Sequence, residues 1–265
     1  MNLQNLHTHT AFCDGADMPE EIIKTALEKG FDSIGFSEHS YMWASDFSVK
    51  IGDHTKEYKE EINRLKEKYE GIIDIFLGLE FEMYSKVDTT GFDYLIGSAH
   101  YFKIGDKYVG FDRSQQEVEN VINTYFNGNG MAYAKYYYKT LAQLPEYGDF
   151  DIIGHFDLIM KHSDNITFFD ASSKEYINAA IEAMEALKGK IPVFEVNTGA
   201  MARGYKDAPY PAKWILEELK KHNSRVIITS DFHRNNTLDY AFSETAKVLS
   251  DMGFKDFFNI DFIQK

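Results

Sequence analysis

The segment 5–15, NLHTHTAFCDG, decides how the rest of the chain is interpreted. Side chains at positions i and i+2 of an extended strand point to the same face, so His7 and His9 converge. Two neutral imidazoles on one face form a pair of metal ligands. Asp14 follows in a glycine-containing turn and is close enough to add an oxygen ligand. An isolated His-x-His pair is equally compatible with chance, so the remaining sequence has to decide.

Length and composition indicate an ordinary soluble globular protein. The chain has 265 residues, of which 44% are hydrophobic and 26% are charged. Barrel-like α/β proteins commonly use this length as one domain, so residues 1–265 are predicted to form a single domain. There is neither an 18-residue apolar run nor a basic N-terminus followed by an apolar core. We therefore expect no transmembrane helix and no secretory signal.

The net charge and the cysteine content indicate which kinds of binding partner and which cellular location to expect. The formal net charge is −14, which weighs against nucleic-acid binding because phosphate backbones are repelled. A small phosphorylated substrate remains compatible, since metal ions and a few local cations can reverse the sign in one pocket. Cys13 is the only cysteine, so no intramolecular disulfide is expected, and a cytoplasmic location is favoured. We interpret Cys13 as a small packing residue.

Short apolar runs alternate with helical patterns along the chain. The runs, expected to be strands, are Leu3–His9, Ser33–Glu38, Ile72–Glu80, Tyr94–His100, Ile152–His155, Val193–Asn197 and Val226–Asp231. The predicted helices are Pro19–Lys29, Lys56–Lys68, Gln115–Tyr125, Met131–Leu144, Ser173–Leu187, Pro211–Lys221 and Thr237–Met252. Such alternation predicts a mainly parallel sheet with right-handed crossovers. Seven strands without a flexible linker favour a closed or nearly closed barrel, with an open doubly wound sheet as the alternative.

Two stretches do not fit the alternation. Residues 41–54 are polar and aromatic, and we expect a long loop after the second strand. Residues 101–113 carry Gly105-Asp106 between apolar flanks, which predicts a small hairpin.

Metal-competent or polar residues stand at the C-terminal end of every apolar run. Six of the nine histidines fall there, namely His7, His9, His39, His100, His155 and His233. Glu80 and Asp231 end two of the runs. In a parallel α/β architecture all these ends open on one face. So many imidazoles and carboxylates at one rim would be costly without a cation, and the pattern predicts a polynuclear metal site.

The ordered set of motifs resembles the polymerase-and-histidinol-phosphatase (PHP) superfamily, and within it the histidinol-phosphatase branch. The matching segments are 7–10 (HTHT), 37–39 (SEH), 78–80 (GLE), 97–100 (GSAH), 154–157 (GHFD), 195–198 (EVNT) and 230–233 (SDFH). The ordered set is very specific and covers almost the whole chain. The resemblance implies an α/β fold, a distorted TIM-like (β/α)7 barrel, with a metal site at the C-terminal ends of the strands.

The resemblance also implies three divalent metal ions and how they are held. The first ion would be held by His7, His9, Glu80 and Asp231, the second by Glu80, His100 and His155, and the third by His39, His233 and Asp14. Asp14 is a departure, because family members often have a histidine in this turn. A proline often found shortly after His39 is also missing. The imidazole and carboxylate donors are compatible with zinc, manganese, iron or cobalt.

As a function, the resemblance implies hydrolysis of L-histidinol phosphate to L-histidinol and phosphate in histidine biosynthesis. We hypothesise in-line attack on phosphorus by a metal-bridging hydroxide. Glu80, Asp231 and His233 are the predicted catalytic residues. Asp231, His233 or another group at the rim would help to protonate the leaving alkoxide, and the sequence does not decide which. The alternatives are a nuclease or other phosphoesterase on the same barrel, and a non-catalytic metal-binding module.

Basic side chains near the predicted rim are few. Arg203 and Lys161 follow strand ends in regions where relatives bind phosphate, and we predict this role for both. Arginine can grip phosphate with two donors, which lysine cannot. Glu38 and Asp157 are expected to orient histidines. The roles of Glu82 and Glu195 stay open.

Overall fold

The structure, a computed structural model, describes residues 3–46, 52–163 and 166–258. Seven parallel strands form one sheet in the order β1-β2-β3-β4-β7-β8-β9. Their bounds are β1 Gln4–Asn5, β2 Ser33–His39, β3 Asp74–Glu82, β4 Tyr94–Ser98, β7 Ile152–Ile153, β8 Val193–Asn197 and β9 Arg225–Thr229. The parallel order confirms the predicted α/β class.

Short hydrogen-bonded segments beyond the strands close the sheet. Thr8 forms an isolated parallel bridge with Phe232, which follows β9. The backbone N–H of His9 donates to the Phe232 carbonyl at 2.8 Å, and the N–H of Phe232 donates to the His7 carbonyl at 3.0 Å. The Asn5 side chain adds a hydrogen bond to Ser230 Oγ at 2.7 Å. The sheet is therefore a nearly closed, distorted barrel, as predicted, and not an open sheet.

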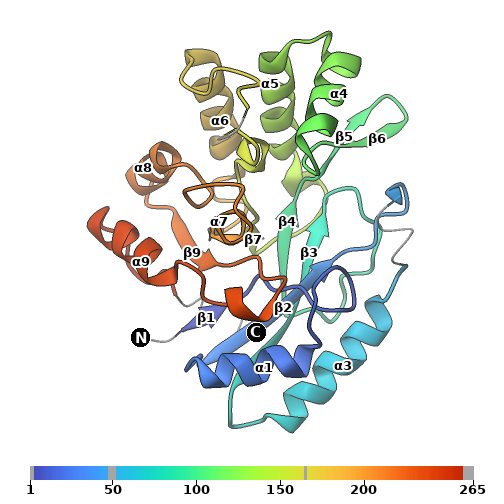
Figure 1. Cartoon of the computed structure of the whole chain (residues 1–265), viewed down its shortest axis with the longest axis vertical. Coiled ribbons are helices and arrows are strands. Elements are labelled where there is room, and N and C mark those ends of the chain that lie inside the picture. The colour runs from blue at the N-terminus through green and yellow to red at the C-terminus, as the bar shows by residue number, and fades with distance from the viewer. Residues whose placement is uncertain (1–2, 47–51, 164–165, 259–265) are drawn as a thin grey trace.

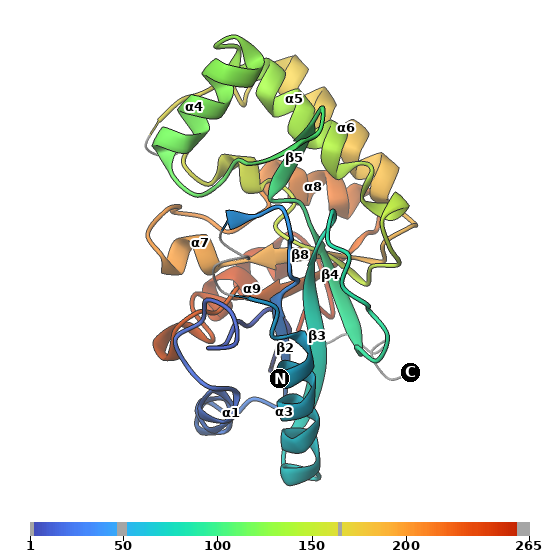
Figure 2. The same cartoon turned by 90° about the vertical axis from the view of Figure 1, so that its right-hand side faces the viewer.

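Helices cover the outside of this barrel (Figure 1). Their bounds are α1 Pro19–Glu28, α3 Thr55–Lys68, α4 Gln115–Phe126, α5 Gly130–Leu141, α6 Lys174–Leu187, α7 Gly199–Ala202, α8 Lys213–Lys221 and α9 Phe242–Asp251. Figures 1 and 2 both show α4, α5 and α6 at the end of the molecule opposite α1 and α3. Among the helices of the described residues, none has the length and apolarity needed to span a bilayer.

The predicted hairpin is confirmed. Strands β5 (Tyr101–Ile104) and β6 (Lys107–Gly110) pair antiparallel, with Ile104 opposite Lys107. Gly105 begins the two-residue turn with φ at +60°, a conformation that glycine adopts without strain. The middle of the predicted 41–54 loop, residues 47–51, lies outside the described residues.

Three element boundaries differ by three or more residues from the sequence-based predictions. Helix α5 ends at Leu141 instead of Leu144, because Pro145 has no N–H to donate to the Leu141 carbonyl. Helix α9 begins at Phe242 instead of Thr237, since Ala241 before it has φ at +56°. Strand β1 is only two residues long, because the chain leaves the β1–β2 ladder after Asn5 to make the closing bridge.

An apolar cluster fills the barrel interior below the strand ends. It contains Leu6, Tyr94, Ile96, Ile152, Val193 and Ile227. The Tyr94 hydroxyl donates to the Leu6 carbonyl at 2.5 Å, which satisfies a polar group inside the barrel. Because apolar side chains fill the interior, the polar functional groups lie at the C-terminal ends of the strands.

Gly78→Ala is expected to destabilise the protein. A Cβ at Gly78 would lie 2.1 Å from a Tyr94 ring carbon, and Tyr94 is buried. Overpacking of this kind costs about 1–3 kcal/mol, which corresponds to a melting temperature lower by roughly 2–12 °C. Differential scanning calorimetry measures this. The control is Gly110→Ala in β6, where a Cβ meets nothing closer than 3.5 Å. Equal melting temperatures for the two variants would contradict the packing argument.

Candidate metal centre

The side chains at the strand ends meet around one buried carboxylate, Glu80 of β3. Its Oε2 lies 2.7 Å from His39 Nδ1, at the end of β2. Its Oε1 lies 2.9 Å from His155 Nε2 and 3.5 Å from His100 Nε2, from the segments after β7 and β4. The geometry therefore gathers residues from across the chain at the rim that the sequence predicts.

The four residues predicted for the first ion come together. Glu80 Oε2 lies 3.4 Å from His7 Nε2 and 3.5 Å from His9 Nε2. Asp231 Oδ1 lies 3.7 Å and 3.3 Å from the same two nitrogens. Neither Nε2 atom has a hydrogen-bond partner among the described residues, although both atoms are buried. Converging buried donor atoms without hydrogen-bond partners fit a divalent cation.

The second predicted group uses the other oxygen of Glu80. His100 and His155 both approach Oε1, and their ring centroids lie 5.0 Å apart. Glu80 thus presents one oxygen to each of two neighbouring histidine groups. This is the arrangement of a carboxylate that can bridge two metal ions.

The third predicted group forms on the outer side of the centre. Asp14 Oδ2 lies 3.3 Å from His233 Nε2 and 3.7 Å from His39 Nε2. Asp14 Oδ1 lies 3.7 Å from His9 Nδ1. Together these four residues bring their ligand atoms within 4.8 Å of one another. The aspartate in this turn therefore points its oxygens where the third ion is expected.

Several imidazoles are oriented by the nitrogen that faces away from the centre. His7 Nδ1 lies 2.5 Å from Glu195 Oε1, and His100 Nδ1 lies 3.2 Å from Glu82 Oε2. His233 Nδ1 lies 2.8 Å from the Asp231 carbonyl oxygen. Each contact leaves Nε2 directed at the carboxylates of the centre, as is usual for metal-binding histidines.

Among the described residues, neither Glu38 nor Asp157 forms a hydrogen bond with a histidine side chain, in contrast to the predicted orienting role. The Glu38 carboxylate accepts from the Thr10 N–H at 2.8 Å and from the Cys13 thiol. Asp157 Oδ2 accepts from the Ala212 N–H at 2.9 Å. The interpretation of Cys13 as only a packing residue is incomplete, since its thiol holds Glu38. The orienting carboxylates are instead Glu82 and Glu195, whose roles the sequence left open.

The sequence contains a signal for one of these two carboxylates, Glu82. Glu82 is two residues after Glu80 in the same strand, so the two side chains share a face. Glu195 lies within the buried strand β8, but nothing local in the sequence indicates that it reaches His7, which lies 188 residues away.

Ionisation of the carboxylates in the centre depends on the basic side chains beside them. Burial raises the pKa of Glu80, but His39 and His7 more than offset this and hold the pKa well below its usual value. Burial likewise opposes ionisation of Asp231, yet Arg203 and His7 keep its pKa well below normal. Burial together with His233 and His39 lowers the pKa of His9 to about 3. Ionised carboxylates next to a neutral imidazole form a suitable donor set for a metal ion.

Both predicted phosphate-binding cations lie at the same cavity. The cavity has a volume of about 350 Å³, and its lining includes Asp14, Glu80, Lys161, Arg203 and His233. Arg203 follows α7, and its Nη2 donates to Asp231 Oδ2 at 2.8 Å. Lys161 Nζ donates to Asp112 Oδ2 at 2.9 Å, a partner that the sequence analysis does not identify.

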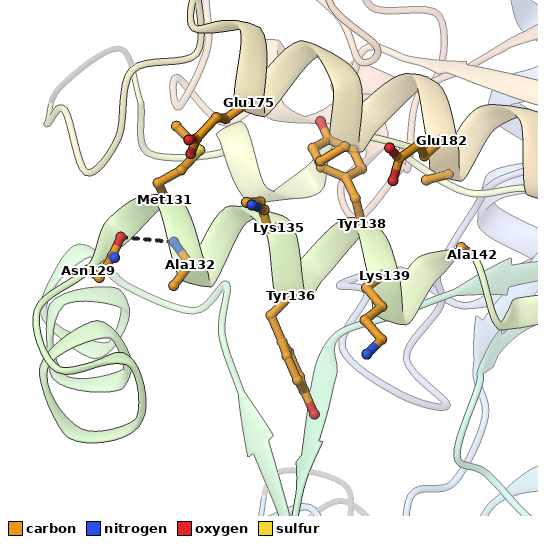
Figure 3. Close-up of a pocket in the computed structure, with 12 residues that line it drawn as sticks. Asn129, Met131, Ala132, Lys135, Tyr136, Tyr138, Lys139, Ala142, Glu175 and Glu182 are labelled. Carbon is orange, nitrogen blue, oxygen red and sulfur yellow. Dashed lines mark hydrogen bonds between the residues drawn. The ribbon is translucent and has the colours of Figure 1, made fainter.

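A second hollow, between α5 and α6, lacks comparable chemistry. It has a volume of about 550 Å³, and its charged lining residues are Lys135, Lys139, Glu175 and Glu182 (Figure 3). None of the lining residues is a histidine, a cysteine or an aspartate. The histidine-lined cavity is therefore the candidate site.

Comparison with known proteins gives results in line with this geometry. The family model of the PHP domain matches residues 5–199. The histidinol-phosphatase of Bacillus subtilis (strain 168) is 26% identical over 267 residues, which cover 91% of this chain and 97% of that protein.

Two crystal structures share the fold. A Listeria monocytogenes protein superimposes with a TM-score of 0.75 at 20% identity, covering 91% of this chain and 99% of the other. The histidinol phosphate phosphatase of Lactococcus lactis, solved in complex with zinc, L-histidinol and phosphate, has a TM-score of 0.72 at 20% identity. That match covers 96% of this chain and 95% of the other.

Proposed function

Because the chain belongs to the PHP domain family, we propose that it is a metal-dependent phosphomonoesterase that hydrolyses L-histidinol phosphate to L-histidinol and phosphate. The observation that carries this proposal is the convergence of five strand-end histidines on Glu80, with a sixth, His233, at Asp14, in a cavity that also holds Arg203 and Lys161. The nearly full-length similarity to a histidinol-phosphatase supports the choice of substrate. Histidine biosynthesis in the cytoplasm, carried out by residues 1–265 as one domain, is part of the proposal.

We propose that the centre holds three divalent ions in the groups described above. Glu80 would bridge the first two ions, with Asp14, His39 and His233 holding the third. When bound, such ions supply Lewis-acid stabilisation of the phosphoryl oxygens and lower the pKa of a water molecule. The imidazole and carboxylate donors admit zinc, manganese, iron or cobalt, and zinc is the ion we choose for the tests, as the Lactococcus structure contains it.

The residues of this chain contribute binding, orientation and proton transfer. Arg203 Nη1 donates to the Asp231 carbonyl at 3.1 Å, so its guanidinium is held beside the centre, where it can neutralise charge on a phosphoryl oxygen. Lys161 adds a second positive charge to the same cavity. Asp231 and His233 lie next to Arg203, and we assign to this pair the transfer of a proton from a water molecule to the leaving alkoxide.

Arg203→Lys is expected to reduce kcat/KM for L-histidinol phosphate by about 10–100-fold. A charge-assisted hydrogen bond contributes roughly 1.5–3 kcal/mol, and lysine cannot reproduce the two-donor contact with phosphate. Steady-state phosphate release measures the effect, which should appear chiefly in KM. The matched control is Arg64→Lys on α3, where the arginine side chain is 51% exposed and does not line the cavity. A kcat/KM within twofold of the control would remove Arg203 from the phosphate site.

The substrate assignment is tested by comparing zinc-loaded protein on several substrates. We expect kcat/KM for L-histidinol phosphate to exceed that for other small phosphomonoesters by roughly 100-fold, because a polar site rejects substrates that leave its groups unpaired. A single-stranded oligonucleotide should not be cleaved, in keeping with the net charge of −14. Higher activity on another ester, or on the oligonucleotide, would retain the metal centre but overturn the substrate.

A further inference from the structure

We propose that Glu195 is a positioning residue, which fixes the tautomer and orientation of His7 so that Nε2 of this histidine faces the metal centre. The inference rests on the metal centre of the proposed function but not on the identity of the substrate. It concerns a carboxylate in the middle of β8, a strand that is separated from β1 by β9 around the closed barrel.

Four donors surround the Glu195 carboxylate, which is fully buried. Oε1 lies 2.5 Å from His7 Nδ1 and accepts from Thr229 Oγ1 at 2.7 Å. Oε2 accepts from the His155 N–H at 2.6 Å and from Asn197 Nδ2 at 3.0 Å. Each oxygen therefore has two hydrogen-bond partners, and these four contacts fix the position of the carboxylate.

These contacts determine which nitrogen of His7 carries a proton. An ionised carboxylate only accepts hydrogen bonds, so His7 Nδ1 has to be the donor. In the metal-binding form, the lone pair is then on Nε2, which points to Glu80 Oε2 at 3.4 Å and Asp231 Oδ1 at 3.7 Å. The opposite tautomer would place a hydrogen where the first ion is expected.

Glu195 also ties two of the proposed metal-binding groups together. Oε1 contacts the ring nitrogen Nδ1 of His7, and Oε2 accepts a hydrogen bond from the backbone N–H of His155. The Nε2 atom of the same His155 lies 2.9 Å from Glu80 Oε1. The contacts join segments following β1 and β7 to β8, and Thr229 adds β9. A single side chain thus sets the relative position of ligands on either side of Glu80.

An amide cannot replace this carboxylate. Glutamine has one acceptor oxygen and an NH₂ group that only donates. The backbone N–H of His155 cannot reverse its polarity, so the oxygen would turn to His155 and the NH₂ group to His7. His7 Nδ1 would then become the acceptor, and its proton would move to Nε2, where it competes with the metal ion.

The test compares zinc binding by wild-type protein and Glu195→Gln. Metal-free protein is titrated with Zn²⁺ against a chromophoric chelator. We expect one zinc ion to bind about 10–100-fold more weakly in the variant, the usual loss when the partner of a metal-binding histidine is removed. The ions that do not depend on His7 should keep their affinity within about threefold. Zinc affinities all within twofold of wild type would overturn the inference.

A second readout reports the tautomer itself. In zinc-loaded wild-type protein, proton NMR should show a strongly downfield His7 Nδ1–H signal, since this proton is shared with a carboxylate. The signal should disappear in Glu195→Gln. A purely structural role for Glu195 would leave it in place, with a lower melting temperature as the only change, and that result would also overturn the inference.

Two further variants control the experiment. Glu82→Gln makes the same change at the carboxylate 3.2 Å from His100 Nδ1, and it should weaken a different ion while leaving the His7 signal unchanged. Glu195→Asp keeps the charge but withdraws the carboxylate by one methylene, and should give an intermediate loss. If Glu195→Gln does not fold, Glu195→Asp carries the test, and wild-type affinity together with an unshifted His7 signal would refute the role. Failure of wild-type protein to bind zinc would instead contradict the proposed function.

Discussion

Replacing Glu80 by glutamine is expected to reduce kcat by about 10³–10⁴-fold. The carboxylate lies within 3.5 Å of nitrogens from five histidines, and it presents one oxygen to each of two groups of ligands. An amide offers a single neutral acceptor, so it can neither bridge two cations nor balance their charge. Metal ions stabilise such a transition state by several kcal/mol, and each 1.36 kcal/mol is roughly tenfold in rate.

The measurement is the rate of phosphate release at saturating L-histidinol phosphate, with both proteins loaded with zinc in the same way. Glu60→Gln on α3 is the matched control, because that side chain is 66% exposed and lies outside the cavity. The control should retain wild-type activity. A Glu80→Gln variant with more than a tenth of wild-type kcat would show that Glu80 does not bridge the reacting centre.

Loading with metal should raise the melting temperature of the protein by roughly 8–16 °C. A ligand that binds only the folded state at 1,000 times its Kd stabilises that state by about 4 kcal/mol. For a chain of this size each kcal/mol corresponds to about 2–4 °C. The metal-free centre holds buried carboxylates whose low pKa values depend on nearby positive charge, as at Glu80 and Asp231. A bound metal ion would supply positive charge to these carboxylates in place of protonated histidines.

Calorimetry with zinc and with a chelator tests this expectation, and Glu80→Gln should show a smaller shift than wild type. Addition of magnesium at the same concentration is the control, since magnesium prefers sites made of oxygen ligands alone. A zinc-induced shift below about 2 °C in the wild-type protein would contradict a preformed site for several ions.

The sequence was sufficient to predict the fold class and the convergence of the ligands. Both follow from local patterns. Alternating strands and helices produce a parallel sheet, and residues after parallel strands meet at one rim. His39, at the end of β2, and His155, after β7, come together for this reason, although 116 residues separate them, the difference between their positions.

Contacts that depend on the closed barrel could not be predicted in the same way. Glu195 reaches His7 across 188 residues because β8, β9 and the β1 segment are neighbours only after closure. The hydrogen bond between Asn5 and Ser230, 225 residues apart, depends on the same closure. The backbone conformation of Ala241 could not be predicted from the sequence either, and the predicted start of α9 is therefore too early.

Titration of metal-free protein with Zn²⁺ during hydrolysis of L-histidinol phosphate tests the central claim most directly. The account predicts no phosphate release before zinc is added and full activity when the centre holds three equivalents per chain. Release of phosphate by chelator-treated protein would contradict it. A lack of phosphate release at every zinc concentration would also contradict the account, because the histidine cluster around Glu80 would then not be a catalytic zinc centre for this substrate.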